Sequence, residues 1–458
     1  MLIDRHEADN IFERIPGLTI KMSPELAAID NVLDDDALFC MIRDDLTQRY
    51  PKTLTAGRKS TPVEVILRML SVRHLYDWSY EQTEQQVADS LVLRQFCCVY
   101  FHAVPDHTTL CKWAQLIQAE TLEAFNGRIL TLAIDNKLTR GRKLRMDGTV
   151  AETTIHHPTD SSLLADSVRV LGRTLTRAKK ALGSNTDLAK ETFRNRTRSA
   201  KRAARRIAQL SRRGREQLKP HYQRLMRATQ ATIRQAELVL TELQTTAAEE
   251  GHRLIQTLQD FLPRAEQVLE QARRRVINGE SVPAAEKLVS IFEPHTDIIR
   301  RGKPTRDTEF GHKLWLGEVE GGFVSQYAVL NGNPADDAQW QPTLKRHIQQ
   351  FNHPPWQASA DRGVHSADNE EYAARLGVKR VILPKPGRKS AKRRKHERQR
   401  WFWRGRRFHA GVEGRISVIK RKHGLDRCPN RGRAGFERWV GWSVIANNLT
   451  MMGRGLSP

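Results

Sequence analysis

Apolar residues recur at helical spacing between about residues 62 and 132. The first stripe has intervals of three and four residues, which predict an amphipathic helix. Its members are Val63, Ile66, Leu67, Leu70 and Leu75. Ser79 followed by Gln82 has the form of a capping box, so a second helix is predicted to begin there. A third helix is predicted to begin with Asp106 or Thr108 as its N-cap.

These three short helices form a predicted domain over residues 59–135, preceded by a weakly patterned arm over residues 1–58. Short helices joined by sharp turns are typical of a helix-turn-helix DNA reader. That interpretation places Thr109 and Lys112 on the helix in the major groove. The same pattern equally predicts a dimerisation or structural bundle, and the sequence leaves both interpretations open.

A helical composition rich in Ala, Arg, Gln, Glu and Leu extends from about residue 163 to residue 288. Its second half carries an apolar stripe at helical spacing. The stripe consists of Ala236, Leu240, Leu243, Ala247, Leu254, Leu258, Leu262, Ala265 and Leu269. Pro263 is predicted to kink it. We expect a long antiparallel helical hairpin over residues 163–295, with a basic first arm that contacts DNA. The second arm is predicted either to contact DNA or to serve as a coiled-coil spacer or dimer contact.

Strand patterns flank this helical segment on both sides. The first predicted strand covers residues 143–154, and Gly321-Gly322 predicts the turn of a later hairpin. The other predicted strands are residues 311–320, 323–330, 356–360 and 378–383, and the predicted helices are residues 341–351, 369–376, 408–422 and 436–452. This order predicts an α/β core with helices over a mixed sheet, divided between residues 140–162 and 296–458.

The charge is strongly basic and unevenly distributed. The chain has 76 Lys and Arg residues against 52 Asp and Glu residues, a net charge of +24. Residues 173–234 hold 19 basic and 3 acidic residues, and residues 379–433 hold 21 and 3, so the two segments carry +16 and +18. Such focused basic stretches suit a phosphate backbone, and the alternative is a solvated surface or a disordered tail. Within a basic tract over residues 385–407, the low-complexity part up to residue 400 is predicted to stay mobile until it meets DNA.

The cysteines and the apolar runs indicate the compartment. Five Cys residues form no CxxC pair, which predicts a reducing environment with neither a disulfide framework nor a zinc site. Cys97 and Cys98 lie in an apolar run and are predicted to be core residues. No apolar run approaches the ~18–20 residues of a membrane span, and the N-terminus lacks an apolar signal segment. A cytoplasmic protein without a membrane partner is expected.

Three acidic residues stand in contexts that suggest chemistry. Asp147 and Asp361 each end a short apolar stretch and are followed by Gly at the next or next-but-one position. A strand delivers a carboxylate to a sheet edge in this way, before the chain turns. Glu413 opens a segment with a helical pattern. Three carboxylates from two strands and a helix suit a pair of Mg²⁺ ions, with Mn²⁺ as an alternative, because hard cations prefer oxygen ligands.

Around these residues the sequence resembles the DDE transposases of bacterial insertion sequences, in particular the ISNCY-like group near the IS-five type. The resemblance is carried by Asp147-Gly-Thr with Glu152-Thr, by Ala360-Asp-Arg-Gly-Val-His-Ser-Ala-Asp-Asn-Glu370, and by Glu413-Gly-Arg-Ile-Ser417 with Lys420. The helical block from about residue 60 to residue 120 resembles the N-terminal domain of these transposases, so the resemblance covers most of the chain. It implies a ribonuclease-H-like core with Asp147 on its first strand, Asp361 after its fourth strand and Glu413 on a late helix.

The last motif of that family has the form Tyr-x2-Arg-x3-Glu-x6-Lys. Glu413 and Lys420 keep its final spacing, and because seven residues are two helical turns, both side chains share one face. His409 stands at the Arg position and Arg406 at the Tyr position. The DNA contacts expected on this helix are Lys420, Arg407 and Arg415.

Two further features have alternative interpretations. Glu152, five residues past Asp147, is predicted to lie on the opposite strand face as an accessory or structural residue. Trp401 and Trp403 interleave with arginines, a pattern that suits a flipped or unpaired base and equally suits core packing.

The predicted function is that of a transposase that binds the terminal inverted repeats of its own insertion sequence and cuts and joins double-stranded DNA with Mg²⁺. Backbone contact is assigned to the basic arm, through Arg205 and Arg206, and end recognition to the N-terminal helical block, through Thr109 and Lys112. A homodimer or higher oligomer that bridges two ends in the bacterial nucleoid is expected. The alternatives are a ribonuclease-H-like nuclease without transposition and a domesticated, non-catalytic DNA-binding protein.

Overall fold

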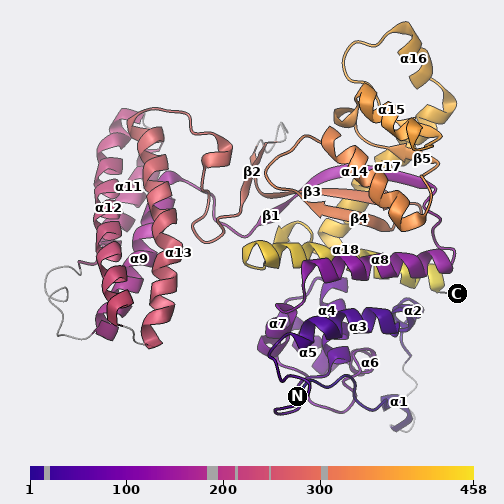
Figure 1. Ribbon diagram of the computed structural model, residues 1–458, viewed down its shortest axis with the longest axis horizontal. Helices are drawn as coiled ribbons and strands as arrows, with labels where there is room; N and C mark the ends of the chain where they lie inside the picture. The colour runs from indigo at the N-terminus through magenta and orange to yellow at the C-terminus, as the bar shows by residue number, and fades with distance from the viewer. Residues whose placement is uncertain (15–20, 183–193, 212–214, 247–248, 301–307, 458) are drawn as a thin grey trace. The chain divides into compact units, whose positions relative to one another are not determined.

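The computed structural model consists of two compact units. Unit 1 comprises Met1–Glu152 and His312–Pro458, and unit 2 comprises Thr153–Gly311 (Figure 1). Unit 2 is therefore a single insertion in the chain of unit 1. The structure describes residues 1–14, 21–182, 194–211, 215–246, 249–300 and 308–457.

The N-terminal part of unit 1 is built from helices. They are α1 (Ile11–Arg14), α2 (Pro24–Leu33), α3 (Asp36–Thr47), α4 (Val63–Leu75), α5 (Tyr80–Asp89), α6 (Leu91–Phe96), α7 (His107–Ala114) and α8 (Ala119–Asp135). The predicted capping box is confirmed, because Ser79 and Gln82 exchange hydrogen bonds at the start of α5. Asp106 is the N-cap of α7, as predicted. The expected weakly patterned arm instead contains α2 and α3, whose apolar faces are buried in the main core.

A mixed sheet forms the other part of unit 1. Its strands are β1 (Lys143–Thr153), β3 (Thr308–Val319), β4 (Val324–Val329), β5 (Gln357–Ser359), β6 (Arg380–Ile382) and β7 (Arg427–Cys428). They are ordered β4-β3-β1-β5-β6, and β7 also pairs with β1. β5 is parallel to β1 and to β6, whereas β3 and β4 form an antiparallel hairpin. The hairpin turns at Gly321 and Gly322, as predicted, with φ of 86° and 82° that glycine adopts without strain.

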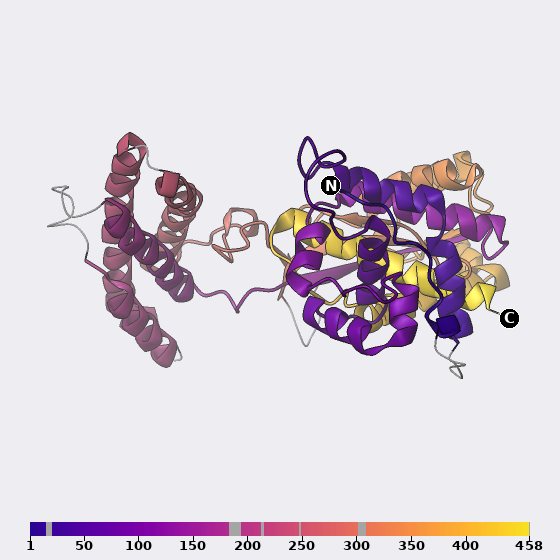
Figure 2. The ribbon, with the colours of Figure 1, turned by 90° about the horizontal axis from the view of Figure 1, so that it is seen from below.

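Helices cover the sheet and join it to the N-terminal part. They are α14 (Asp337–Phe351), α15 (Ala367–Arg375), α17 (Arg400–Lys422) and α18 (Gly432–Leu456). α17 lies against β5 and β6, while α18 packs on α2, α4 and α8 and on β4. Figure 1 accordingly shows α8 and α18 between the sheet and the N-terminal helices, which lie in front of α18 in Figure 2. α18 is buried almost completely over its middle, including its polar residues Asn447 and Asn448, which form hydrogen bonds there.

All five cysteines lie in unit 1. Cys97 and Cys98 are buried in the core, as predicted, and burial raises the pKa of Cys98 to about 11, so its thiol is neutral. All five cysteines are free. Among the helices in the described part of the chain, none combines the length and the hydropathy that crossing a membrane requires.

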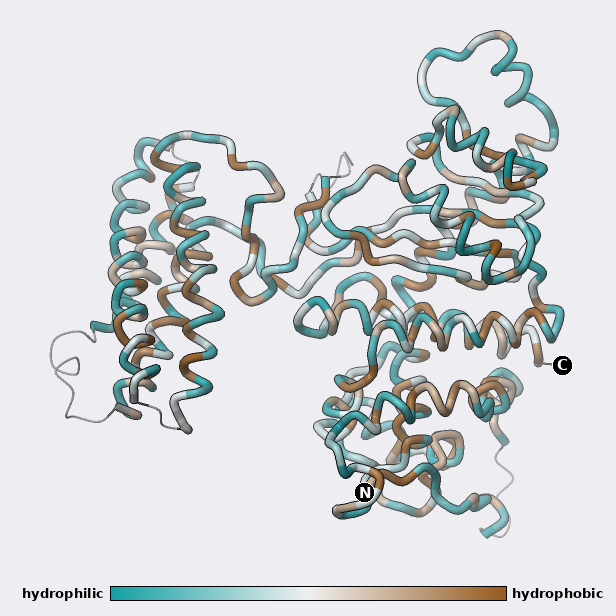
Figure 3. The backbone as a smooth tube through the Cα atoms, viewed as in Figure 1, coloured by the Kyte–Doolittle hydropathy of each residue, from teal (hydrophilic) through white to brown (hydrophobic). Residues whose placement is uncertain are grey.

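Unit 2 is a helical bundle with its own apolar core. Its long helices are α9 (Asp160–Leu182), α11 (Thr197–Leu210), α12 (Arg215–Thr246) and α13 (Glu249–Ala272). α9 contacts the other three, and the apolar faces meet inside the bundle (Figure 3). After α13 the chain continues through a π-helical turn (Arg273–Ile277) to β2 (Asp297–Arg300), which pairs antiparallel with the first residues of β3.

The predicted helical hairpin is wrong, since four long helices pack together within the described part of this unit. The physical reason is that the basic arm has an apolar face of its own. α11 buries Ala203 and Ile207 just as α13 buries Leu258, and two helices could not cover all these faces. α13 runs through Pro263 as a single helix. The apolar stripe thus packs on its own chain, so a dimer contact requires another surface. Ala247 lies outside the described residues.

The low-complexity basic tract contains a short helix, α16 (Ala391–Glu397), with Ser390 as its N-cap. Its anchor is Glu397, which accepts a hydrogen bond from Arg393 Nε at 2.8 Å and pairs with Lys389. Burial raises the pKa of Glu397, but the hydrogen bonds from Lys389 and Arg393 outweigh it and lower the pKa to about 2. Within the tract that was predicted to be mobile until it meets DNA, these residues therefore form a helix, and Glu397, the one carboxylate among the basic residues of the tract, pairs with two of them.

Gly453 allows α18 to approach α2 closely. A Cβ at this position would lie 2.8 Å from the carbonyl oxygen of Glu25, a backbone atom that cannot turn away. We expect Gly453→Ala to lower the free energy of unfolding by about 1–3 kcal/mol, the usual cost of overpacking, as measured by urea denaturation. Gly251→Ala in α13 is the control, because nothing lies within 4 Å of its Cβ, and it should stabilise by about 0.5–1 kcal/mol. A neutral Gly453→Ala would contradict the tight contact.

Candidate active site

Asp147 lies on β1, and Asp361 lies two residues past the end of β5, the neighbouring parallel strand. β1 and β5 are paired in a register that sets Arg145 opposite Ser359. Asp147 and Asp361 each follow two residues later, and the chain is still extended at Asp361, with φ −67° and ψ 169°. Residues at matching register on adjacent strands point to the same face of a sheet. The register therefore carries both carboxylates to one side of the sheet, at the carboxyl end of β5.

α17 covers that side of β1. Arg145 shares a strand face with Asp147, because the two are separated by one residue. Its Nη1 donates a hydrogen bond to the carbonyl oxygen of Phe408 in α17 at 2.5 Å. A Cβ at Gly411 would lie 2.2 Å from the same Nη1, so the Arg145 guanidinium lies directly against the backbone of α17 at Gly411. Asp147 itself is half-buried, and its Oδ1 accepts a hydrogen bond from the N–H of Gly148 at 2.7 Å.

Asp361 is exposed, and α17 supplies a partner for it. The side chain of Asp361 is 64% exposed, and its Oδ1 lies 3.0 Å from Nε2 of His409. Nδ1 of His409 has no hydrogen-bond partner among the described residues. The geometry therefore assigns the imidazole proton to Nε2, which donates to the carboxylate. The residue that replaces the expected Arg of the last motif is thus in direct contact with a predicted catalytic acid.

Glu413 lies one helical turn after His409 on α17 and is exposed. Residues four apart share a face of a helix, so Glu413 is on the same face as the residue that contacts Asp361. The three acids thus come from two adjacent strands and from the helix that covers them. In the part of the chain that the structure describes, however, no three His, Cys, Asp or Glu side chains are grouped closely enough to hold a metal ion.

A buried carboxylate fixes α17 to the sheet. Glu318 on β3 is 1% exposed and accepts hydrogen bonds from Arg145 at 2.8 and 2.5 Å. It also accepts one from Arg415 Nε at 3.4 Å, and Arg415 Nη1 donates to Asn447 on α18 at 3.2 Å. Arg415, predicted to contact DNA, therefore has partners within the protein. The signal that the sequence interpretation missed was a glutamate directly after the apolar run Leu314-Trp-Leu316 and Gly317 of the strand.

The other predicted DNA contacts on α17 divide into internal and exposed residues. Nζ of Lys420 donates a hydrogen bond to the carbonyl oxygen of Val150 on β1 at 2.6 Å. Arg407 is exposed, and its guanidinium lies 4.9 Å from the ring centroid of Trp403, which is 53% exposed. Trp401 instead packs edge-on against the ring of His396. Only Arg407 of the three cations thus has its charge at the surface.

The predicted DNA contacts outside α17 also include both a residue with a partner inside the protein and residues that are exposed. The hydroxyl of Thr109 donates to the side chain of Asp106 at 2.7 Å and so belongs to the N-cap of α7. Lys112 is exposed on the same helix. In unit 2, Arg205 and Arg206 are both exposed on α11. The structure leaves these three cations available to a partner and gives Thr109 a local role.

Unit 2 also contains a basic groove between α9 and α11, with a volume of about 790 Å³. Its charged lining residues are Arg169, Arg173, Arg177 and Arg198. Of these, Arg169 pairs with Asp166 at 2.8 Å. No carboxylate is among the described residues that line the groove, so it is a concentrated positive site.

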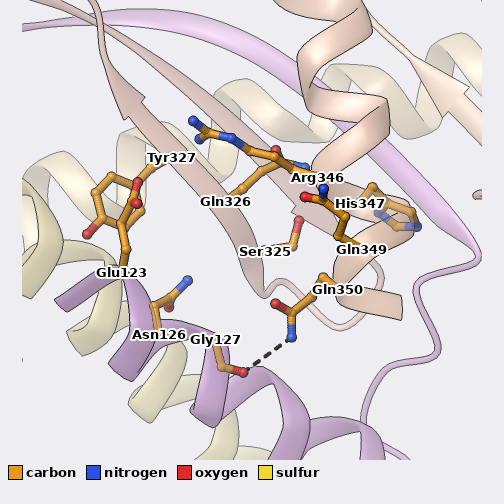
Figure 4. Close-up of a pocket in the computed structure, with 10 residues that line it drawn as sticks. All are labelled: Glu123, Asn126, Gly127, Ser325, Gln326, Tyr327, Arg346, His347, Gln349 and Gln350. Atoms are coloured by element: carbon orange, nitrogen blue, oxygen red, sulfur yellow. Dashed lines mark hydrogen bonds between the residues drawn. The ribbon is translucent and has the colours of Figure 1, made fainter. Parts of the chain in front are cut away.

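A polar pocket of about 250 Å³ lies between α8, β4 and α14 in unit 1 (Figure 4). Gln350 reaches across it and donates to the carbonyl oxygen of Gly127 at 3.3 Å. Burial lowers the pKa of His347 in its wall to about 4, so this imidazole is neutral. None of the predicted site residues is among the described residues that line it. The pocket is therefore separate from the three acids.

Residues 18–116 match a family described as a transposase domain (DUF772). This part of the chain is similar to a transposase domain. The matching region contains α2 to α7 and ends before Asp147. No curated protein and no solved structure matched the chain. The predicted likeness to a transposase is thus confirmed at the level of this domain, and Lys112 lies within it.

Proposed function

We propose that the protein is a Mg²⁺-dependent DDE transposase that cuts and joins DNA at the ends of its own element. The observation that carries the proposal is the register of β1 and β5, which brings Asp147 and Asp361 to one side of the sheet beneath α17. The similarity of residues 18–116 to a transposase domain supports it independently.

The order of the site residues along the fold supports a ribonuclease-H-like core. Counting the sheet strands of unit 1 in chain order, β1 is the first and β5 the fourth. Asp147 lies on the first, Asp361 directly follows the fourth, and Glu413 lies on a later helix. This is the arrangement that the resemblance to DDE transposases implies.

The donor set fits the proposed metal, because carboxylate oxygens are the ligands that Mg²⁺ prefers. Asp147, Asp361 and Glu413 are the residues that would hold it. When bound, a pair of such ions activates the attacking oxygen and stabilises the leaving oxygen of a phosphodiester. The chain contributes positioning: Glu318 fixes α17 to β3, and His409 orients the Asp361 carboxylate.

The experiment that tests this function uses oligonucleotide duplexes that carry the ends of the element. With Mg²⁺ we expect both cleaved and joined products, and with EDTA neither. Cleavage without joining would identify a ribonuclease-H-like nuclease instead. Binding without either reaction would identify a non-catalytic DNA-binding protein, the alternative favoured by the lack of a grouped metal site among the described residues.

The DNA backbone is proposed to contact the basic face of unit 2, where Arg205 and Arg206 are exposed near the groove lined by Arg198. We expect the Arg205→Glu, Arg206→Glu double variant to weaken binding to all DNA sequences alike. The slope of log affinity against log salt should become shallower by about 2, because each phosphate contact contributes about 0.9. Affinities measured between 50 and 200 mM salt, in the range where such slopes are determined, provide the test.

Two control variants separate backbone contact from sequence recognition. Arg253→Glu removes an exposed cation from α13, outside the basic groove, and should leave the salt slope unchanged. Lys112→Ala should relax the preference for the element end, because Lys112 is exposed on the predicted recognition helix. A change of sequence preference in the Arg205/Arg206 variant without a change in slope would contradict the assignment.

A dimer or higher oligomer on DNA is also proposed, since excision requires chemistry at two ends. The apolar stripe of α13 is covered by its own bundle, so the contact is assigned to another surface. Light scattering of the full chain with end DNA should find two ends in one complex. Complexes with one chain and one end at every concentration would overturn this part of the proposal.

A further inference from the structure

Unit 1 contains a large cavity that the proposed chemistry does not use. It has a volume of about 820 Å³ and lies between α4, α5, α7 and the start of α18. Its volume is within the range of about 300–1,000 Å³ that is usual for small-molecule sites. Asp147, Asp361 and Glu413 are not among the described residues that line it. An occupant of this cavity would therefore be additional to the substrate at the acids.

A buried cation in the wall indicates the charge of the occupant. Arg73 is 6% exposed, yet it forms no ion pair within 4.0 Å with any described residue. Its Nη1 lies 2.6 Å from Nε2 of His74, and its guanidinium lies 4.2 Å from the ring centroid of Tyr80. Its Nε has no hydrogen-bond partner among the described residues. A buried charge without a counter-ion is costly, so the site favours an anion.

The neighbours of Arg73 do not supply that anion. His74 is neutral, because burial, the charge of Arg73 and the nearby His423 lower its pKa well below the usual value. Two carboxylates do line the cavity, Asp77 and Glu81, and both are exposed. Neither carboxylate lies within 4.0 Å of the Arg73 guanidinium, so neither forms an ion pair with it.

Two more arginines line the cavity, from the beginning of α18. Arg438 is half-buried, Arg431 is exposed, and neither forms an ion pair among the described residues. A planar guanidinium can hold two oxygens of one phosphate, which makes arginine the usual residue for recognising phosphate. Arg73 of α4 and Arg438 of α18 thus both line the cavity, and neither guanidinium group has an ion-pair partner among the described residues.

Aromatic side chains make up much of the remaining wall. Trp78 is half-buried and stacks on Tyr76 with ring centroids 4.7 Å apart. Trp439 and Trp442 line the cavity from α18, and Nε1 of Trp442 has no hydrogen-bond partner among the described residues. Indole faces beside arginines are the combination on which bases of single-stranded nucleic acid stack. The cavity thus offers both a phosphate site and a flat apolar surface.

We propose that this cavity binds one nucleotide unit, with its phosphate on Arg73 and Arg438 and its base against Trp78. The same chemistry is presented by a free nucleoside monophosphate and by an unpaired nucleotide at the end of a DNA strand. The inference goes beyond the proposed function, since it requires neither Mg²⁺ nor the three acids. Its failure would leave the cleavage and joining assays unaffected.

Binding to the full-length chain is measured in EDTA, so that no cleavage accompanies it. The probes are deoxyadenosine monophosphate, inorganic phosphate, and a duplex with one unpaired 3′ nucleotide compared with the blunt duplex. We expect the nucleotide to bind at least about tenfold more tightly than inorganic phosphate, because base stacking adds to the phosphate contact. A preference for the duplex with the unpaired nucleotide identifies the DNA strand as the source, and no such preference identifies the free nucleotide.

Two variants divide the site into its parts. Arg438→Met should weaken the binding of nucleotide and phosphate alike by at least about tenfold, because it removes charged hydrogen bonds. Trp78→Leu should weaken nucleotide binding and leave phosphate binding unchanged. Arg454→Met is the matched control, since Arg454 is exposed on the same helix, sixteen residues and about 24 Å further along.

The variants avoid the most buried residue, Arg73, whose loss would also affect folding, and circular dichroism checks that each variant is folded. Nucleotide affinity equal in Arg438→Met and in the wild-type chain would overturn the proposal. Binding of phosphate and nucleotide with equal affinity, insensitive to Trp78→Leu, would also overturn it, because the cavity would then be an anion site without a base.

Discussion

We expect Asp147→Ala, Asp361→Ala and Glu413→Ala each to abolish Mg²⁺-dependent cleavage and joining of an end-containing duplex. The expected loss is at least about a thousandfold in rate, because a metal site supplies several kcal/mol of transition-state stabilisation and each 1.36 kcal/mol is tenfold. DNA affinity should be nearly unchanged, since none of the three carboxylates is among the described residues that line the basic groove of unit 2. The measurements are single-turnover cleavage and joining rates, with binding measured in parallel.

The matched control is a carboxylate on the same strand. Glu152 lies on β1 as Asp147 does, but it points to the opposite face and pairs with Arg427 at 2.5 Å. Glu152→Gln and Asp147→Asn remove the same charge from the same strand. We expect the rate to fall only in Asp147→Asn, with at most a small loss of stability in Glu152→Gln. Strand transfer retained by Asp147→Ala would remove Asp147 from the active site.

Glu318→Gln produces the largest expected loss of stability. Glu318 is 1% exposed and forms ion pairs with Arg145 and Arg415. Its neutralisation therefore leaves two guanidinium groups without their shared counter-charge. Breaking a buried ion pair by changing one partner costs about 3–5 kcal/mol. For a unit of this size that corresponds to a fall in Tm of about 5–10 °C, measured by calorimetry.

The control for this prediction is an ion pair at the surface. Glu371 and Arg375 lie 3.9 Å apart with side chains 70% and 68% exposed. Glu371→Gln should change stability by less than about 1 kcal/mol, as is usual for exposed pairs. Because Glu318 holds α17 against the sheet, Glu318→Gln should also reduce the cleavage rate. Equal Tm values for the two variants would show that Glu318 does not anchor the helix.

Local features of the fold could be predicted from the sequence because they depend on residues a few positions apart. The capping box of Ser79 and Gln82, the N-cap Asp106 and the turn at Gly321 are each specified by short-range geometry. The position of Asp361 at the end of a strand was predictable for the same reason. The mixed α/β character followed from the order of such elements.

Predictions that required knowledge of partners far along the chain were less successful. Arg415 and Lys420 resemble DNA contacts in sequence, but their partners Glu318 and Val150 are 97 and 270 residues away. The prediction of two helices in unit 2 was wrong for a similar reason. An apolar stripe indicates that a helix face is buried, but it does not indicate which other helix covers that face.

The sequence by itself determined which residues are candidates for the proposed chemistry: the three carboxylates, the two basic segments and the N-terminal block that is similar to a transposase domain. Tertiary structure alone decided which basic side chains are available to a partner. An ion pair with a residue far along the chain leaves no pattern in the local sequence. Arg205 is exposed while Arg415 is paired inside the protein. It also decided that Asp147 and Asp361, 214 residues apart, hold matching positions, since strand register is set by packing across the whole sheet.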